Sequence, residues 1–475
     1  MSIGFLIICL VLMTQCQNTT RYKALELNYV DLSDNDTITA QPVLSKPLKL
    51  RKSDAVDNVI IVHSEEIINP MLSGIGGAFN EQGGESFMSL PSDKRKALAE
   101  ALFNPETGAG FSLCRTAVGS SDFGLSAYSY SETPDDYEMK YFSVERDKAS
   151  VLPFINAAMA ENPSLKIFAS PWSPPGWMKI SGKMDGGTDD NREQNMLIND
   201  PEIHKAYALY FSKYVQAYAE NGITIDRLLI QNETDMNPKY PGCNMYPEQM
   251  ADLAFNYIRP QFEKDDLKTE LWAGTFRDVD QVGSRPDAQN FMALEGAMEI
   301  DGVGLQYCPP KTLLELKAKY PELKIMHTEG VCNRGQNSIQ QAKKRFSEVA
   351  NWLNAGCENY CYWNMVLNET STSAWDWPQN SLINIDRQTG IVTYNPDYAT
   401  ISLFSRFIRP GDQSVKVDTP KDIIAIAVKN ESRLVVFLQN ATDSALKQNI
   451  DIDGQLSTVE LPSNSVSAVV FKMKK

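Results

Sequence analysis

Asp226-Arg-Leu-Leu-Ile-Gln-Asn-Glu233 is a short apolar run that ends in a glutamate, and Leu323-Lys-Ile-Met-His-Thr-Glu329 repeats this pattern further along the chain. Apolar runs of this length are typical of strands buried in a parallel sheet. The carboxyl ends of such strands form the face on which α/β enzymes carry their chemistry. The two runs therefore predict a parallel α/β fold with Glu233 and Glu329 on its functional face.

Apolar runs alternate with amphipathic stretches of helical length through the middle of the chain. The expected strands are 75–79, 110–118, 165–171, 227–231, 270–275, 303–307, 324–327 and 360–366. The expected helices between them are 92–103, 149–160, 201–220, 247–262, 288–298, 311–319 and 338–355. This alternation favours a closed (β/α)8 TIM barrel over an open sheet, with Glu233 after the fourth strand and Glu329 after the seventh.

The segments outside this barrel are predicted to be β-structure. Residues 17–72 are polar and then mildly alternating, and residues 401–475 contain short alternating runs separated by turn residues. We expect these two chain ends to form an attached antiparallel β-sandwich. The barrel is expected to occupy residues 73–400.

Residues 1–16 contain an apolar run that is too short to span a bilayer and is typical of a secretory signal. Cys16 directly follows this run, which resembles a loosely matched lipoprotein cleavage box. We expect secretion to the periplasm or the cell surface, either with membrane attachment through a lipidated Cys16 or without it. A cytoplasmic protein is the remaining alternative.

Charge and histidine content exclude several classes of function. The net charge of -15 opposes binding to nucleic acid, so no such partner is expected. Only three histidines occur, which leaves few residues for a multi-histidine metal site or a histidine-centred triad. Because histidine ligands are scarce, no metal is expected. The chain has no glycine-rich loop that opens a helix, so no phosphate or dinucleotide cofactor is expected. No signal in the sequence indicates a particular oligomeric state.

Paired carboxyl groups are typical catalytic residues of glycoside hydrolases. Retention of configuration needs a carboxylic acid for the leaving oxygen and a carboxylate about 5 to 5.5 Å away to attack the anomeric carbon. Asn232, beside Glu233, suits a hydrogen bond to a sugar hydroxyl. Arg115 suits orientation of a nucleophilic carboxylate and Asp122 suits acceptance of sugar hydroxyl protons. A structural ion pair at the rim is the alternative interpretation of Arg115 and Asp122.

Tryptophans cluster near the expected strand ends, as in carbohydrate pockets. Trp172 and Trp177 lie in the proline-rich segment Ala169-Ser-Pro-Trp-Ser-Pro-Pro-Gly-Trp177, Trp363 lies on the eighth strand, and Asn380 follows that strand. Indoles on rigid loops stack on sugars, whereas aromatic core under the loop is the alternative interpretation. These residues predict a carbohydrate or glycoconjugate as the partner.

Seven stretches together give the chain its family resemblance. They are Gly74-Ile-Gly-Gly-Ala-Phe, Asp122-Phe, Ser129-Tyr-Ser-Glu-Thr-Pro-Asp-Asp136, Ala169-Ser-Pro-Trp-Ser-Pro-Pro-Gly-Trp177, Gln231-Asn-Glu, Thr328-Glu and Tyr362-Trp-Asn. With these stretches the chain resembles glycoside hydrolase family 30, clan A retaining enzymes that include glucosylceramidase and endo-β-1,6-glucanases. The resemblance covers the chain from about Gly74 to its end.

This resemblance implies roles for the residues already singled out. Glu233 would be the acid/base and Glu329 the nucleophile. The subsite for the terminal sugar would be lined by Asp122, Trp172, Asn232, Trp363 and Asn380. The family fold, a (β/α)8 barrel beside a β-sandwich built from both chain ends, agrees with the fold expected from the alternating runs.

The sixth strand departs from the family pattern. Where the family has His-Trp-Tyr, this chain has Gln306-Tyr307-Cys308, so a histidine and a tyrosine that normally flank the nucleophile are missing. The tyrosine hydrogen bond to the nucleophile is expected to be lost, and Gln306 and Tyr307 are expected to bind substrate instead. Either the substrate differs from glucosylceramide, or neighbouring residues compensate. We expect a retaining β-glycosidase acting on β-glucosidic bonds. The alternatives are a non-catalytic carbohydrate-binding surface protein on a degenerate barrel and, more weakly, an enzyme with a carboxylate-bound metal.

Overall fold

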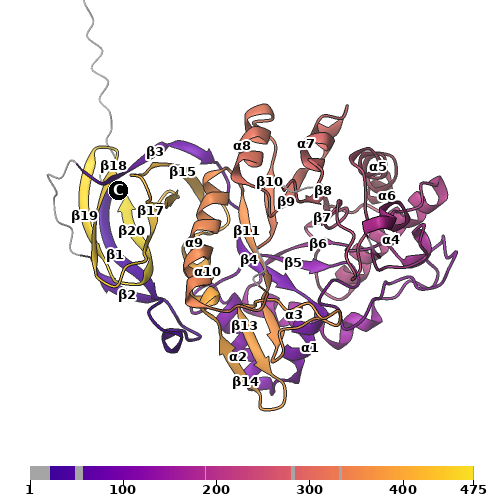
Figure 1. The fold of residues 1–475 in the computed structure, drawn as a ribbon, viewed down its shortest axis with the longest axis horizontal. Coiled ribbons are helices and arrows are strands. Elements are labelled where there is room, and N and C mark those ends of the chain that lie inside the picture. The colour runs from indigo at the N-terminus through magenta and orange to yellow at the C-terminus, as the bar shows by residue number, and fades with distance from the viewer. Residues whose placement is uncertain (1–21, 49–56, 188, 280–283, 331–333, 474–475) are drawn as a thin grey trace, which may run out of the picture.

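The computed structural model describes residues 22–48, 57–187, 189–279, 284–330 and 334–473 (Figure 1). The predicted signal segment with Cys16 lies outside the described residues and stays a prediction. Within the described ranges, no helix combines the length and hydropathy needed to cross a bilayer.

Eight parallel strands form the barrel sheet in the centre of the molecule (Figure 1). They are β4 (Gly74–Phe79), β5 (Leu113–Ala117), β6 (Lys166–Ser170), β7 (Arg227–Leu229), β8 (Glu270–Phe276), β9 (Gly302–Gln306), β10 (Ile325–Glu329) and β11 (Asn359–Asn364). The ladder runs from β10 through β9 down to β4 and then to β11. The Asn359 amide bridges the remaining seam, because it donates to the His327 carbonyl and accepts from the His327 N–H, both at 2.9 Å. The predicted (β/α)8 barrel is confirmed.

Helices cover the outside of this barrel. They are α1 (Glu81–Ser89), α2 (Ser92–Phe103), α3 (Val151–Glu161), α4 (Pro201–Glu220), α5 (Pro247–Leu253), α6 (Arg259–Lys264), α7 (Asp287–Met292), α8 (Pro310–Lys319), α9 (Ile339–Asn354) and α10 (Pro396–Phe407). Asp200 caps α4 through a 2.8 Å bond from the Glu202 N–H. The single helix expected over 247–262 is divided by a π-helical turn at Ala254–Ile258. Pro260 explains this turn, because its ring would clash with the carbonyl one helical turn earlier.

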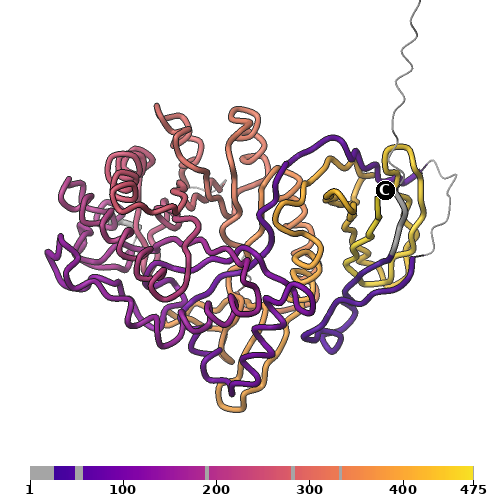
Figure 2. The backbone as a smooth tube through the Cα atoms, turned by 180° about the vertical axis from the view of Figure 1, so that it is seen from behind, coloured from indigo at the N-terminus to yellow at the C-terminus, as the bar shows by residue number. Residues whose placement is uncertain are grey.

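Both chain ends join in a second, nine-stranded sheet beside the barrel (Figure 2). Its strands are β1 (Tyr22–Asp31), β2 (Leu44–Pro47), β3 (Val59–Asn69), β15 (Gln413–Asp418), β16 (Ala425–Lys429), β17 (Arg433–Asn440), β18 (Leu446–Ile452), β19 (Gln455–Leu461) and β20 (Ser465–Met473). Leu27 in β1 and Val459 in β19 share one hydrophobic core although their strands lie far apart in the strand order. The sheet therefore curls over this core, and its two halves face each other as the layers of a sandwich do.

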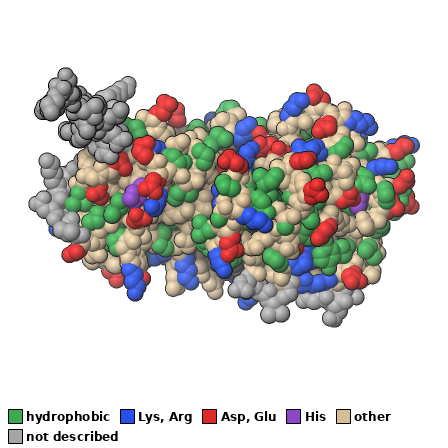
Figure 3. Space-filling model, turned by 90° about the horizontal axis from the view of Figure 1, so that it is seen from above, with side chains coloured by type: hydrophobic (Ala, Val, Ile, Leu, Met, Phe, Trp, Pro, Cys, Tyr) green, Lys and Arg blue, Asp and Glu red, His purple; other side chains and the backbone are tan. Residues whose placement is uncertain are grey.

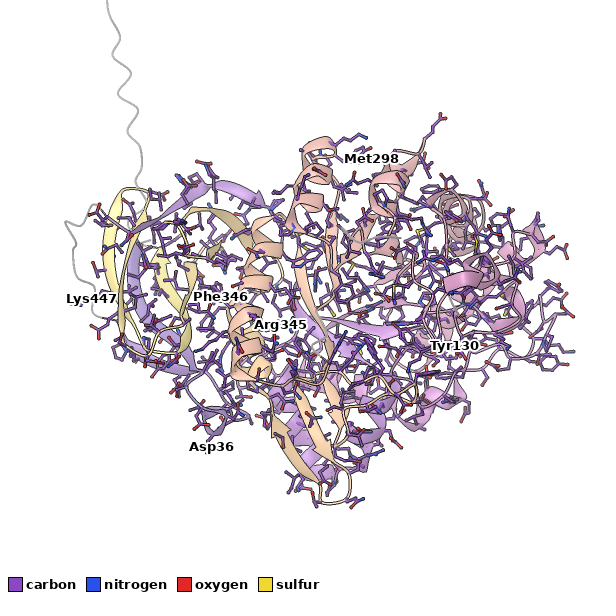
Figure 4. The ribbon with its side chains drawn as sticks, in the orientation of Figure 1. Asp36, Tyr130, Met298, Arg345, Phe346 and Lys447 are labelled. Atoms are coloured by element: carbon purple, nitrogen blue, oxygen red, sulfur yellow. The ribbon has the colours of Figure 1, made fainter. Side chains whose placement is uncertain are left out.

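Aromatic stacking joins the barrel helices to this sheet. Phe346 of α9, labelled in Figure 4, stacks on Phe404 of α10 at 5.5 Å between ring centroids. Phe404 in turn stacks on Phe437 of β17 at 4.9 Å. α10 runs without a break across residue 400, where the sequence placed the end of the barrel. A small sheet of β12 (Val366–Asn368), β13 (Ile383–Asp386) and β14 (Ile391–Tyr394) extends from the barrel beside α1 at the lower edge of Figure 1.

Candidate active site

Glu233 and Glu329 both lie at the carboxyl end of the barrel. Glu329 is the last residue of β10, whereas Glu233 follows β7 in a left-handed backbone conformation with a φ of 48°. The Glu233 N–H donates to the Thr275 carbonyl at 3.0 Å, and the Asn232 N–H donates to the Pro171 carbonyl at 2.8 Å. These bonds tie the segment after β7 to the ends of both neighbouring strands. They therefore fix the position of the Glu233 backbone.

The Glu329 carboxylate is surrounded by donors. Arg115 Nη1 donates to Glu329 Oε2 at 2.7 Å, and Gln306 Nε2 lies 3.4 Å from the same oxygen. The Tyr307 hydroxyl donates to the other oxygen, Oε1. Arg115 is fully buried, so its charge acts on Glu329 with little screening by solvent. These contacts favour the ionised form of Glu329.

Tyr307 corrects one expectation from the sequence. The missing family tyrosine was expected to leave the nucleophile without a phenol hydrogen bond, yet Tyr307 supplies that bond. Side chains alternate along a strand, and Gln306, the last residue of β9, points inward at Glu329. Tyr307 would therefore point outward, but a left-handed φ of 60° at this residue turns its ring back to Glu329. Of the two possibilities that the sequence left open, compensation by a neighbouring residue is the one that the structure contains.

Glu233 has a different electrostatic environment. The pKa of Glu233 is raised to about 7, chiefly by burial. The charges of Glu329 and Asp235 add to the rise, whereas Arg277 and a Gln306 hydrogen bond oppose it. Burial also raises the pKa of Glu329, but Arg115, Tyr307 and Gln306 all oppose this shift. Because only Glu329 receives a close charge-assisted bond, Glu233 is the better holder of a proton.

Asn232 and Arg115 connect the two glutamates. Arg115 Nη2 donates to Asn232 Oδ1 at 2.7 Å while Nη1 of the same guanidinium donates to Glu329. Thr275 Oγ1 donates to Asn232 Oδ1 at 3.0 Å. The Asn232 amide oxygen is thus taken up by protein donors, which leaves its NH2 group directed away from Arg115 and available to a ligand hydroxyl. The predicted group of Glu233, Glu329, Arg115 and Asn232 is brought together.

Two tryptophans form an aromatic wall beside this group. Trp172 and Trp363 stack at 4.9 Å between ring centroids, and the Arg115 guanidinium carbon lies 4.4 Å from the Trp172 ring. Both indoles are 2% exposed, so they pack as part of the barrel mouth rather than as an open platform. Trp363 Nε1 is buried and has no hydrogen-bond acceptor among the residues that the structure describes. That N–H is a free donor at the site.

Asp122 is buried near both glutamates. Burial raises the pKa of Asp122 well above its ordinary range, and the charges of Glu329 and Glu233 raise it further. Gln379 Nε2 lies 3.3 Å from Asp122 Oδ2, whereas Oδ1 has no donor in the described part of the chain. Asp122 therefore offers one unused acceptor of the kind that a sugar hydroxyl needs.

Two further predicted residues have other described partners. The Asn380 side chain donates to the Tyr362 hydroxyl, which in turn donates to Asp397 at 2.7 Å. Trp177 Nε1 donates to the Ser131 carbonyl at 3.0 Å, so this indole fastens the loop after β5. Their contact with a substrate stays a prediction.

Three site residues were missed at the level of sequence. Arg277 lies 3.6 Å from Glu233, Ser170 accepts from Arg115 at 2.7 Å, and Gln379 contacts Asp122. Arg277 directly follows β8 and Ser170 ends β6, so their places at strand ends were an available signal. Gln379 lies in a long loop after β12, where no pattern marks it. Among the described residues, no cluster of three or more His, Cys, Asp or Glu side chains is arranged to hold a metal ion.

Comparison with known proteins identifies the family of this chain. The model of the Glycosyl hydrolase family 30 TIM-barrel domain matches residues 72–408. Putative glucosylceramidase 3 from Caenorhabditis elegans is 28% identical over 458 residues, which cover 90% of this chain and 84% of that protein. Endo-1,6-beta-D-glucanase BGN16.3 from Trichoderma harzianum is 26% identical over 432 residues, which cover 84% of this chain and 83% of that protein.

A solved structure shares this fold over almost the whole chain. SrfJ from Salmonella typhimurium superposes with a TM-score of 0.83 at 22% identity, over 95% of this chain and 100% of that chain. The family match spans most of the chain and confirms the resemblance found in the sequence motifs. The chain belongs to glycosyl hydrolase family 30 and is an O-glycosyl hydrolase.

Proposed function

We propose that this hydrolase cleaves β-glucosidic bonds with retention of configuration, with Glu329 as the nucleophile and Glu233 as the acid/base. The observation that carries the proposal is the unequal environment of the two carboxyls. Glu329 receives donors from Arg115, Tyr307 and Gln306, whereas burial raises the pKa of Glu233 to about 7. Two carboxyls whose environments separate their protonation states are suited to opposite roles.

In the first half of the reaction, Glu233 donates its proton to the glycosidic oxygen. Glu329 Oε attacks the anomeric carbon, the bond from that carbon to the leaving oxygen breaks, and a glycosyl ester forms on Glu329. The charge of Glu329 is lost in the ester, while Glu233 becomes a carboxylate. Arg115, which also contacts Asn232, keeps the nucleophile aligned with the residue next to the acid.

In the second half, the Glu233 carboxylate takes a proton from water. The water oxygen attacks the anomeric carbon, the ester bond breaks, and Glu329 recovers its negative charge. Two inversions at one carbon return the original configuration. The donors that favour the ionised form of Glu329 also stabilise it as the leaving group in this step.

The spacing of the two carboxyls supports retention. Gln306 borders both carboxyls: its Nε2 lies 3.4 Å from Glu329 Oε2, and its side chain lowers the pKa of Glu233. Two carboxyls that border one amide are closely spaced, as the separation of about 5 to 5.5 Å in retaining enzymes requires.

The proposed substrate is a β-glucoside, because the relatives include glucosylceramidases and endo-1,6-beta-D-glucanases. A non-catalytic binding protein, the alternative, has no need of a buried acid beside a carboxylate held by three donors. Hydrolysis of 4-nitrophenyl β-glucoside, β-1,6-glucan and glucosylceramide in detergent micelles by the full chain distinguishes the substrates. Hydrolysis of none of them would favour the binding protein.

The decisive experiment combines a variant with the stereochemistry of the product. E329Q should lower kcat by about three orders of magnitude or more without unfolding the protein. E315Q is the matched control, because the Glu315 side chain is 49% exposed on α8 and pairs only with Lys311 among the described salt bridges. Proton NMR should show the β anomer of the sugar as the first product. An α anomer first, or full activity of E329Q, would overturn the proposal.

A further inference from the structure

Arg277 places a positive charge beside the proposed acid/base. Its Nε lies 3.6 Å from Glu233 Oε1, and its Nη1 lies 3.8 Å from Asp235 Oδ1. Both distances suit ion pairs but exceed the range of about 2.7 to 3.2 Å that is typical of hydrogen bonds. Nε is buried and has no acceptor among the described residues. Arg277 therefore acts on Glu233 through its charge, without a hydrogen bond that would fix one oxygen of the carboxylate.

Asp235 holds this guanidinium in place. Its Oδ2 accepts from Ser284 Oγ at 2.7 Å and from the Arg285 N–H at 3.4 Å, and the Asp235 side chain is only 2% exposed. The Asp235 carboxylate, fixed in this way, is a second acidic partner for Arg277 besides Glu233. Arg277 therefore keeps one acidic partner when Glu233 is protonated.

Among the described residues, Arg115 lies on the Glu329 and Asn232 side of Glu233, and, Arg277 aside, the other charges beside Glu233 are acidic. Asp122 comes from the loop after β5, Asp235 from the same loop as Glu233, and Glu329 from β10. Arg277 is the positive charge that most strongly opposes them at Glu233. During the proposed reaction the charge of Glu329 disappears when the ester forms and returns when the ester breaks. Arg277 acts in the same direction in both halves, because its own charge does not change.

We propose that Arg277 is a positioning residue that favours the carboxylate form of Glu233, so that Glu233 accepts a proton from water in the second half of the reaction. The inference rests on the proposed function. In the first half the same charge works against Glu233, because it makes the proton leave the acid at a lower pH. Arg277 thereby sets the pH range over which Glu233 serves first as acid and then as base.

R277M removes the charge and should move both Glu233-dependent limbs of the pH profile upward by about one pH unit. With 2,4-dinitrophenyl β-glucoside, whose leaving group needs no acid, the acid limb of kcat reports the second half. With phenyl β-glucoside, the basic limb of kcat/KM reports the first half. Below its acid limb the variant should lose about tenfold in kcat, whereas above the basic limb it should gain in kcat/KM.

Two further variants separate charge from structure. R277K keeps the charge and should retain the limbs of the parent protein, whereas R277Q should repeat the shift and replaces R277M if that variant fails to fold. R387M is the matched control, because Arg387 pairs with Glu85 and Glu369 near the small sheet, away from Glu233. Unmoved limbs in both uncharged variants, or a loss that is equal at all pH values, would overturn the inference.

A parallel experiment on E233A tests the proposed function by itself. If Glu233 is the acid/base, E233A should hydrolyse the dinitrophenyl substrate better than the phenyl substrate and form β-glucosyl azide when azide is added. An E233A variant that lacks these properties refutes the proposed function. An E233A variant that has them, together with unmoved limbs in R277M, refutes only the role of Arg277.

Discussion

Replacing Tyr307 with Phe removes one hydroxyl from the donors around Glu329 and changes little else. The ring and the left-handed backbone at this position are retained, so the packing of the barrel mouth should stay the same. The Tyr307 hydroxyl donates to Glu329 Oε1, whereas Arg115 and Gln306 contact Oε2. Y307F therefore leaves one oxygen of Glu329, the proposed nucleophile, without its described donor.

The size of the effect follows from the charge on the acceptor. A hydrogen bond to an ionised group contributes about 1.5 to 3 kcal/mol, which corresponds to about one to two pKa units. Losing the bond disfavours the carboxylate, so the pKa of Glu329 rises. Because Glu329 must be ionised to attack, the acid limb of kcat/KM should move upward by about one to two pH units. Well below that limb the variant should be about 10 to 100 times slower.

The assay is the pH dependence of kcat/KM on an aryl β-glucoside, together with the unfolding midpoint. Y320F is the control, because the Tyr320 hydroxyl also makes a hydrogen bond, to the Met292 carbonyl at 2.6 Å, but lies beside α8 away from Glu329. The control should keep the profile of the parent protein. If the acid limb of Y307F stays in place, the hydroxyl does not favour the ionised nucleophile and the reasoning fails.

Two other predictions concern stability. The pKa of Glu233 is about 7 in the folded protein, above its ordinary value, so ionising it costs stability as pH rises from about 4.5 to 7. E233Q should therefore match the parent protein at pH 4 and be more stable by up to about 3 kcal/mol at pH 8, measured by urea unfolding. Asp147 accepts hydrogen bonds from Tyr128, Tyr130 and Tyr218 at 2.6 to 2.8 Å, and D147A leaves these buried phenols without an acceptor. D147A should lower the free energy of unfolding by about 3 to 5 kcal/mol, and an unchanged urea midpoint would contradict this accounting.

The barrel and the two glutamates were accessible from the sequence for local reasons. A strand that is buried on both sides shows as an apolar run, and the run from Leu228 to Ile230 needs no knowledge of its neighbours to be recognised. The residue that follows such a run lies at the rim, so Glu233 and Glu329 were placed by position alone. The capped helix α4 is similarly local, because Asp200 and Pro201 mark its start.

Contacts made by loop residues were not accessible in this way. Tyr307 was judged by its place in a motif, and the backbone conformation that turns it to Glu329 is rare for a bulky residue. Gln379 reaches Asp122 although 257 positions separate them in the chain. Such a contact depends on how the loops after β12 and β5 fold over the barrel mouth. The periodicity of apolar residues does not predict the conformation of these loops.

Strain and buried charge meet at the same edge of the barrel. Glu233 and Tyr307 both adopt left-handed backbone conformations, which cost about 1 to 2 kcal/mol each for residues other than glycine. Each is held by a contact across strands: the Glu233 N–H bonds to the Thr275 carbonyl, and the Tyr307 hydroxyl bonds to Glu329. The strained residues are thus the proposed acid/base and a donor to the proposed nucleophile, and both are held by contacts at the barrel mouth. Relaxing either backbone would relieve this strain but would break the contact that depends on it, so each strained conformation persists because neighbouring strands hold it.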